Sequence, residues 1–164
     1  MRNKQMILRA AVMAVIIAAF IIFYFALSTR CILLTNGDTG EILGVFPISP
    51  GDEFSVSFIH SVNKTPVTDV FEVREGSIYA VRTIYYSFGA GVQAEIEEGQ
   101  TLDYGEDGSM IVSGIDKRID KLSYIVGTVS DHILEIKGQA ISLRELCGKN
   151  TVVRFSAGRR LFVK

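Results

Sequence analysis

Several residue types that mark common functional sites are scarce or absent in this sequence. Its 164 residues include no tryptophan, two cysteines, two histidines and three prolines. They contain no Cys-x-x-Cys pair, no His-Glu-x-x-His motif and no Gly-x-Ser-x-Gly elbow, the signatures of zinc sites, metalloproteases and α/β-hydrolases. The motifs therefore predict no metal site and no cofactor, and they identify no catalytic residue.

Acidic residues are missing from the first thirty positions. That segment holds four of the 17 basic residues (Arg2, Lys4, Arg9 and Arg30), whereas all 18 acidic residues come later. Residues 31–164 therefore carry a net charge of −5, although the whole chain carries only −1. An acidic part without a basic stripe is not expected to bind nucleic acid.

An uncharged apolar run, Ala10 to Leu27, follows the basic N-terminus. Its length is at the short end of the roughly 17–25 residues that span a bilayer as a helix. Because the basic flank stays inside, we expect a single-pass protein of the cytoplasmic membrane. Residues 1–30 would be an uncleaved signal anchor, with a transmembrane segment at about 10–27, and residues 31–164 would lie outside. A cleaved signal peptide is the alternative, because Ala26-Leu27-Ser28 has small residues at cleavage spacing.

Beyond the anchor, short runs of β-branched and aromatic residues alternate with turn residues. The predicted strands are 32–35, 41–46, 54–60, 67–74, 77–88, 92–97, 101–104, 110–112, 122–129, 132–137, 151–156 and 161–163. Residues 36–40 indicate a hairpin turn, 142–145 a capped helical turn stopped by Gly148, and 114–121 a charged, solvated connection. The expected fold class is all-β, as an antiparallel β sandwich or a partly open barrel.

The most suggestive polar residues flank a predicted hairpin. If the strands before and after Pro66 pair with their apolar faces together, alternation places His60 opposite Val67 and Phe58 opposite Asp69. His60 and Asp69 would then be diagonal neighbours, about 7–8 Å apart on the core-facing side. A polar pair in that position must satisfy its own hydrogen bonds or line a cleft.

Further residues complete a predicted binding or docking site. Ser61 follows His60, and Ser87 begins a turn in which Gly89 and Gly91 permit positive φ angles. Successive N–H groups in such a turn can hold a small anionic ligand. In the alternative interpretation, His60 closes a strand end through hydrogen bonds to Asp69 and to the loop, and the two glycines only turn the chain.

A serine hydrolase is a second hypothesis, with Ser87 or Ser61 as nucleophile and His60 and Asp69 as its partners. It faces a geometric difficulty, because adjacent residues such as His60 and Ser61 point to opposite faces of a strand. A purely structural envelope protein is the third hypothesis.

The remaining histidine and the two cysteines have less specific interpretations. His132 follows Ser130-Asp131 and is expected to be an exposed turn residue. Cys31 and Cys147 lie in the exported part, where a disulfide is chemically allowed. The alternative is that both are unpaired small hydrophobic residues.

Three motifs together resemble a bacterial family of domains of unknown function, number 1850. They are Phe58-Ile59-His60-Ser61-Val62, Pro66-Val67-Thr68-Asp69-Val70-Phe71 and Ser87-Phe88-Gly89-Ala90-Gly91. The chain departs from the family pattern at Asp69, where glutamate is usual, and at Val92, where proline is expected. Members are often encoded beside TRAP transporters that use a TAXI-type receptor. The resemblance therefore implies association with a solute transporter and implies no particular reaction. Together with the topology and the clustered polar residues, it makes a non-enzymatic extracytoplasmic accessory domain the leading hypothesis, with TRAP transporter subunits as its partners.

Overall fold

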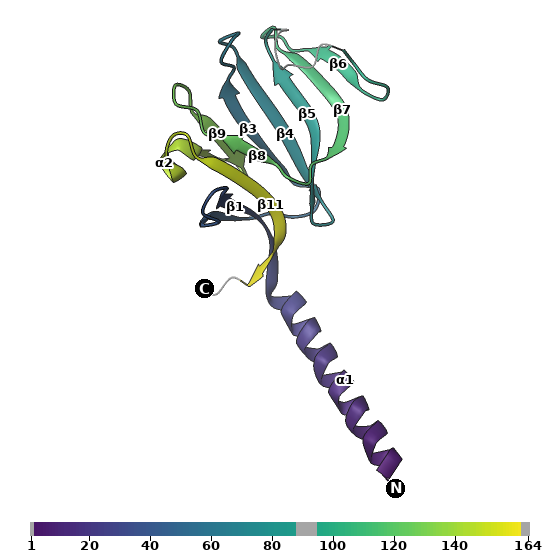
Figure 1. Cartoon of the computed structure of the whole chain (residues 1–164). Helices are drawn as coiled ribbons and strands as arrows, with labels where there is room; N and C mark the ends of the chain where they lie inside the picture. The colour runs from purple at the N-terminus through teal and green to yellow at the C-terminus, as the bar shows by residue number, and fades with distance from the viewer. Residues whose placement is uncertain (1, 88–94, 162–164) are drawn as a thin grey trace.

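The computed structural model of this chain describes residues 2–87 and 95–161. An N-terminal helix precedes two antiparallel β-sheets that pack face to face (Figure 1). The predicted all-β fold is confirmed, and the arrangement is that of a sandwich.

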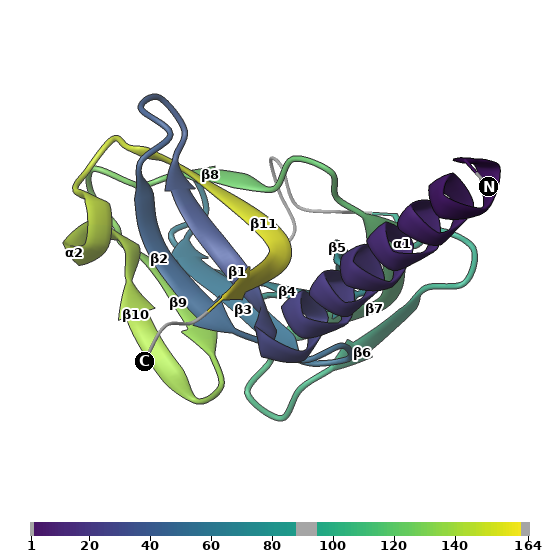
Figure 2. The same ribbon diagram turned by 90° about the horizontal axis from the view of Figure 1, so that it is seen from below.

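Helix α1 (Arg2–Leu27) projects away from the sandwich. Its segment Lys4–Leu27 is the one helix in the described part of the chain that is long and apolar enough to cross a membrane. Seen from the helix side, the smaller sheet lies in front of the larger one (Figure 2). Strand β1 follows α1 without a break, so the anchor candidate leads straight into the smaller sheet.

The two sheets differ in size. Sheet A has the order β2-β1-β11-β8 and comprises β2 (Ile42–Pro47), β1 (Ser28–Asn36), β11 (Val152–Leu161) and β8 (Ser123–Ile125). Sheet B has the order β10-β9-β3-β4-β5-β7-β6 and comprises β10 (Gln139–Ser142), β9 (His132–Ile136), β3 (Glu53–Ile59), β4 (Pro66–Arg74), β5 (Ser77–Tyr85), β7 (Met110–Arg118) and β6 (Thr101–Tyr104). A short helix, α2 (Leu143–Cys147), joins sheet B to β11.

The main core lies between the facing sides of the two sheets. Phe54 stacks on Phe71 of the neighbouring strand at 5.2 Å and on Phe155 of sheet A at 6.0 Å between ring centroids. Each ring occupies a core-facing position of its strand, where every second side chain points to the same face of the sheet. A second buried cluster, which includes Val67 and Tyr85, lies further along sheet B toward the β3–β4 loop.

The hairpin of β3 and β4 has a different register from the predicted one. Phe58 pairs with Val67 and Val56 pairs with Asp69, a shift of two residues that keeps every side chain on its predicted face. His60 instead closes a short loop, because its N–H donates to the Thr65 carbonyl at 2.9 Å. Alternation fixes only the parity of a register, so it could not exclude this shift.

Two charged or turn-like segments also proved to be strand. Residues 114–121 were predicted to be a solvated connection, but β7 continues to Arg118. Positive φ angles at Gly114 (75°) and Asp116 (44°) accompany a bulge against β5 that lets the strand go on. The predicted strands 151–156 and 161–163 are joined in β11, which runs to Leu161 through Gly158.

Other boundaries were predicted with mixed success. The hairpin turn at 36–40 is confirmed, and Asn36 Oδ1 accepts the N–H groups of Asp38 and Thr39. Strand β10 was not predicted, and β8 is much shorter than the predicted strand 122–129. Of the predicted strand 92–97, the described residues 95–97 are not in a strand, and the rest lie outside the described residues.

Both cysteines are unpaired. Cys31 is buried at 1% exposure in β1, and Cys147 is half-buried at the end of α2. Burial raises the pKa of both thiols, which keeps them in the less reactive protonated form. The structure therefore agrees with the interpretation of Cys31 and Cys147 as unpaired residues and not with a disulfide between them.

Candidate functional site

Loops from three parts of the chain meet at the end of the sandwich opposite α1 (Figure 1). In the β8–β9 loop, Ser130 Oγ donates to the carbonyl of Ile59 at 3.3 Å. Thr65 Oγ1 lies 3.2 Å from Ser87 Oγ, just beyond β5. We call this surface the distal tip and define it as residues 59–65, 86–87 and 127–130.

The distal tip exposes apolar side chains and encloses a buried polar group that has no partner among the described residues. Val62 is 65% exposed and Val129 is 90% exposed. Both valines lie in surface loops, where polar residues are more common. Ile59 and Tyr86 are also exposed there. The Nδ2 amide of Asn63 is buried and has no hydrogen-bond partner among the described residues. Apolar side chains exposed together at one end of a domain make a candidate contact surface.

His60 organises the β3–β4 loop. Its Nδ1 accepts the backbone N–H groups of Val62 and Asn63, each at 3.3 Å, and its own carbonyl accepts the Lys64 N–H at 3.0 Å. Because Nδ1 is an acceptor, the neutral imidazole carries its proton on Nε2. His60 therefore shapes the loop from which Val62 projects, which agrees with the loop-closing half of the alternative interpretation.

The other predicted residues at this end fall into two groups. Ser61 is exposed in the loop directly after His60, and Ser87 is half-buried in the distal tip. Gly89 and Gly91, predicted to form an anion-binding turn, lie outside the described residues. The structure thus brings His60, Ser61 and Ser87 to one end of sheet B.

Asp69 does not join this group. It lies four positions beyond Thr65 in β4, on the core-facing side, where its Oδ1 accepts from Thr83 Oγ1 at 3.1 Å. Its Oδ2 accepts from the Tyr124 hydroxyl at 2.8 Å, so the carboxyl links sheet B to β8 of sheet A. The predicted diagonal contact with His60 is therefore wrong, because the register shift moves Asp69 away from the loop.

Burial dominates the electrostatics of this carboxyl. Desolvation raises the pKa of Asp69, and the hydrogen bonds from Tyr124 and Thr83 oppose that rise without cancelling it. The same burial, with Asp69 as a close neighbour, raises the pKa of the Tyr124 hydroxyl. Asp69 and Tyr124, both with raised pKa values, thus form a hydrogen bond that joins the two sheets.

The prediction for His132 is wrong. It is buried at 9% exposure as the first residue of β9, and its ring stacks on Phe58 at 5.1 Å. Its Nδ1 accepts the Gly127 N–H at 3.2 Å, which ties it to the β8–β9 loop. Burial lowers the pKa of His132, so the neutral ring is favoured. A single histidine beside polar turn residues gave no sign of the aromatic neighbour that buries it.

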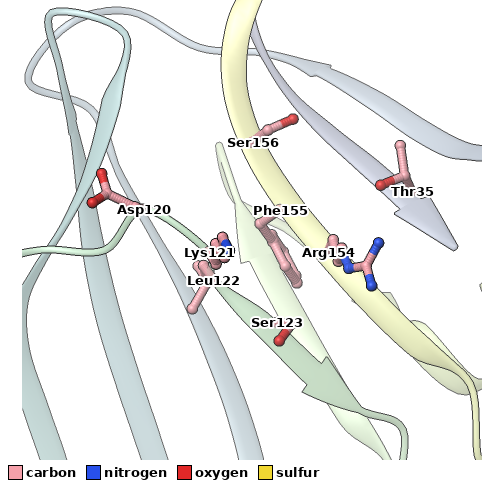
Figure 3. Close-up of a pocket in the computed structure, with 8 residues that line it drawn as sticks. All are labelled: Thr35, Asp120, Lys121, Leu122, Ser123, Arg154, Phe155 and Ser156. Atoms are coloured by element: carbon pink, nitrogen blue, oxygen red, sulfur yellow. The ribbon is translucent and has the colours of Figure 1, made fainter. Parts of the chain in front are cut away.

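An open depression of about 600 Å³ lies on sheet A, away from every predicted residue (Figure 3). Arg154 points away from the core here, since its neighbours Val153 and Phe155 are buried. Thr35 and Ser123 flank it on adjacent strands, in register with it. The spacing of β1 and β11 in sequence gave no indication that these residues would meet.

The sequence missed two residues for identifiable reasons: Val129 in the distal tip and Tyr124 in β8. Val129 stands alone in the polar segment Gly127-Thr128-Val129-Ser130-Asp131, and an isolated apolar residue in a loop was the available signal. Tyr124 lies on a short strand whose pairing with β11 brings it to Asp69. Contacts between sheets depend on topology, which residue periodicity does not encode.

Comparisons with known proteins give one match. The profile of a family described as "Domain of unknown function (DUF1850)" matches residues 54–143, which cover β3 to the start of α2. This range includes His60, Asp69 and Ser87. No curated protein and no solved structure matches the chain significantly.

Proposed function

This chain belongs to the DUF1850 family of domains of unknown function, and from this premise we propose that it is a membrane-anchored docking domain. In this proposal α1 spans the cytoplasmic membrane with its N-terminus inside, and the sandwich lies outside. The distal tip then points away from the membrane toward a partner protein. The basic residues Arg2, Lys4 and Arg9 before the apolar run support this orientation.

The observation that carries the proposal is the exposure of Val62 and Val129 in two loops joined at the distal tip. The Ser130–Ile59 hydrogen bond holds the loops together, so both valines are displayed by one supported surface. Burying such side chains favours association by roughly 25 cal/mol for each Å² of apolar surface.

The partner we propose is a TRAP transporter subunit. The resemblance of the motifs around His60, Asp69 and Ser87 to the family supports this choice. Docking is favoured over hydrolysis by the bonding of Asp69, because its two oxygens accept from Thr83 and Tyr124 rather than from His60. A nucleophile and base in a relay need such mutual contact.

Site-specific photocrosslinking in native membranes tests the docking proposal. A benzophenone amino acid placed at Val62 or Val129 should crosslink to a TRAP transporter subunit, identified by mass spectrometry. The same probe at Ile42, an exposed apolar position in β2, is the matched control and should not. Equal crosslinking from all three positions, or none from the tip, would refute docking through this surface.

Substitution supplies the second part of this test. Val62→Asp together with Val129→Asp should abolish recovery of the transporter subunit with tagged full-length protein in mild detergent. Ile42→Asp should leave recovery unchanged. His60→Ala should weaken recovery, because it releases the loop that carries Val62. Covalent labelling by a serine-reactive probe, lost in His60→Ala, would instead favour the hydrolase hypothesis.

A further inference from the structure

The loop between β8 and β9, which carries Val129, is held in place by side chains. Among the described residues, no backbone-to-backbone hydrogen bond involves residues 127–130. Side-chain hydrogen bonds take their place. One runs from Ser130 Oγ to the carbonyl of Ile59, and two others meet at Gly127. The position of this loop therefore depends on the state of a few side chains.

Both backbone groups of Gly127 are bound. Its N–H donates to His132 Nδ1 at 3.2 Å, and its carbonyl accepts from Arg144 Nη2 at 3.1 Å. The chain turns back here so tightly that a Cβ at residue 127 would clash with the Ser130 carbonyl oxygen. The first bond needs the lone pair of Nδ1, which is available only while that nitrogen carries no proton. We call the bonds of His132 and Arg144 to Gly127 the loop latch, and it closes only when His132 is neutral.

The charged and titratable neighbours of His132 come from several elements. Burial has the largest effect on its pKa and lowers it, the preceding Asp131 opposes that shift, and Arg144 of α2 adds to it. On the side of β8, the Tyr124 ring lies 5.7 Å from the imidazole centroid, and its hydroxyl donates to Asp69 of β4. Strand β3 contributes an uncharged aromatic ring that stacks on the imidazole. The net effect is a lowered pKa of His132, which favours the closed latch at neutral pH.

We propose that His132 makes the distal tip sensitive to pH, so that mild acid releases the loop that carries Val129. When the ring gains a second proton, Nδ1 becomes a donor that faces the N–H of Gly127. The imidazolium also repels the guanidinium of Arg144, which binds the other side of the same residue. Release of the loop weakens docking, and this consequence rests on the proposed docking function.

The direction of the response follows from the two environments of His132. In the closed form its pKa lies below the usual value of about 6.5, and release of the loop admits water and lets the pKa return toward that value. The open form then binds the proton more tightly. The latch is therefore fully favoured above about pH 6.5 and is weakened as the pH falls through the closed-form pKa of His132. One proton changes the ratio of open to closed loops by at most about tenfold for each pH unit.

Nuclear magnetic resonance of the full-length protein in detergent tests the latch. With an affinity tag that lacks histidine, only His60 and His132 contain imidazoles, so isotope labelling of the histidine nitrogens follows each ring separately. Protection of the Gly127 N–H against hydrogen exchange, corrected for the intrinsic rate, is measured from about pH 7.5 to about pH 5. Protection should fall as His132 gains its proton, by up to about tenfold for each pH unit.

The chain offers matched controls for this measurement. In the turn after β1, Asn36 Oδ1 accepts two backbone N–H groups and does not titrate, so protection there should not depend on pH. His132→Asn places an amide oxygen near the position of Nδ1, where it accepts from Gly127 without gaining a proton. Protection of Gly127 in this variant should stay constant. His60→Asn leaves the latch intact and should keep the wild-type response at Gly127.

Unchanged protection of Gly127 after His132 has gained its proton would overturn the proposal. A ring that stays neutral down to about pH 5 would do the same. An equal fall in His132→Asn, or in the Asn36 turn, would show that acid acts on something other than the latch. The wild-type titration decides the question even if His132→Asn does not fold.

Photocrosslinking from Val129 in native membranes separates the latch from the docking function. Crosslinking to the partner should fall between about pH 7.5 and about pH 5.5 in wild type and should persist in His132→Asn. Equal crosslinking at both pH values, while Gly127 is released, would overturn the regulatory role. Absence of crosslinking at both pH values would refute docking through the distal tip, and the exchange measurement would still decide whether His132 holds the loop.

Discussion

At the residue scale, the carboxyl of Asp69 links the two sheets through its hydrogen bonds. Its acceptors are filled by Tyr124 from sheet A and Thr83 from sheet B, so the residue acts as a crosslink within the fold. Because burial raises the pKa of Asp69, the folded state binds this proton more tightly than the unfolded chain does. This places a pH-dependent contribution to stability at the centre of the sandwich.

We predict that Asp69→Asn flattens the acid dependence of stability. The folded pKa of Asp69 lies above the unfolded value of about 3.9, so the folded state binds the proton more tightly. Its contribution is complete below about pH 3.9 and is lost as the pH rises through the folded pKa. Urea unfolding of the full chain in detergent, measured across this range, should show that loss in wild type and in Glu135→Gln, an exposed control on β9. The same slope in Asp69→Asn would contradict the prediction.

The sequence identified part of the residue-scale site. Alternation placed Asp69 on the core-facing side, which is confirmed, and it extended the first strand to His60, whereas β3 ends at Ile59 and His60 begins the loop. It could not show that they are apart, because a shift of two residues preserves the same alternation. It also missed Tyr124, whose contact with Asp69 crosses between sheets and depends on the pairing of β8 with β11.

At the element scale, Asp131 joins the start of β9 to the start of α2. Its Oδ1 accepts from the N–H groups of His132 at 2.7 Å and Arg144 at 3.1 Å, and its Oδ2 accepts from Ser142 Oγ. Ser142 Oγ in turn accepts the Glu145 N–H at 2.9 Å as the N-cap of α2. The predicted capping residue is confirmed, and the carboxylate behind it extends the cap to a second element.

We predict that Ser142→Ala lowers the free energy of unfolding by about 1–2 kcal/mol, as expected for loss of an N-cap. Asp131→Ala should cost more, because three donors then lose their acceptor. Partial burial would raise the pKa of Asp131, but the hydrogen bonds from Ser142, Arg144 and His132 lower it overall. Its contribution is thus present above the unfolded value of about pH 3.9 and is lost as the pH falls through the folded pKa.

Urea unfolding at neutral and acid pH distinguishes these effects. Ser156→Ala, an exposed serine in β11, serves as the control and should unfold like wild type. Asp131→Ala should approach wild-type stability under acid conditions, where the wild-type carboxyl is also protonated. A constant difference between the two at every pH would mean that the charge of Asp131 does not matter.

The elements themselves were predictable where local signals were strong. The Asn36–Gly40 turn and the capped α2 followed from turn and capping residues close together in the chain. β7 was predicted to end before its charged residues, because residues 114–118 lack an apolar alternation. Pairing with β5 supplies the hydrogen bonds that keep this segment extended, and such pairing is a tertiary effect.

At the scale of the whole molecule, the Arg159 side chain links the sandwich to the end of α1. Arg159 spans from β11 near the C-terminus to the carbonyls of Phe25 and Ser28 at the end of the helix. Without this contact, we expect the single chain connection between α1 and β1 to allow the sandwich more freedom to reorient. If α1 crosses the membrane, this contact sets the direction in which the distal tip points, and docking at a fixed height requires such a direction.

We therefore predict that Arg159→Ala increases the motion of the sandwich relative to α1 while leaving the sandwich folded. The chain has no tryptophan, so Tyr104→Trp, at an exposed position in β6, provides a unique fluorescent probe far from the junction of α1 and β1. Time-resolved anisotropy in nanodiscs should show a larger amplitude of slow wobble in Arg159→Ala than in Arg154→Ala, which removes the same charge from the same strand. Arg159→Lys should resemble Arg159→Ala, because an ammonium on a flexible stem lacks the planar fork that bonds both carbonyls and Ser28 Oγ. An equal amplitude of wobble in all variants would mean that the connection between α1 and β1 alone fixes the orientation of the sandwich, without a contribution from Arg159.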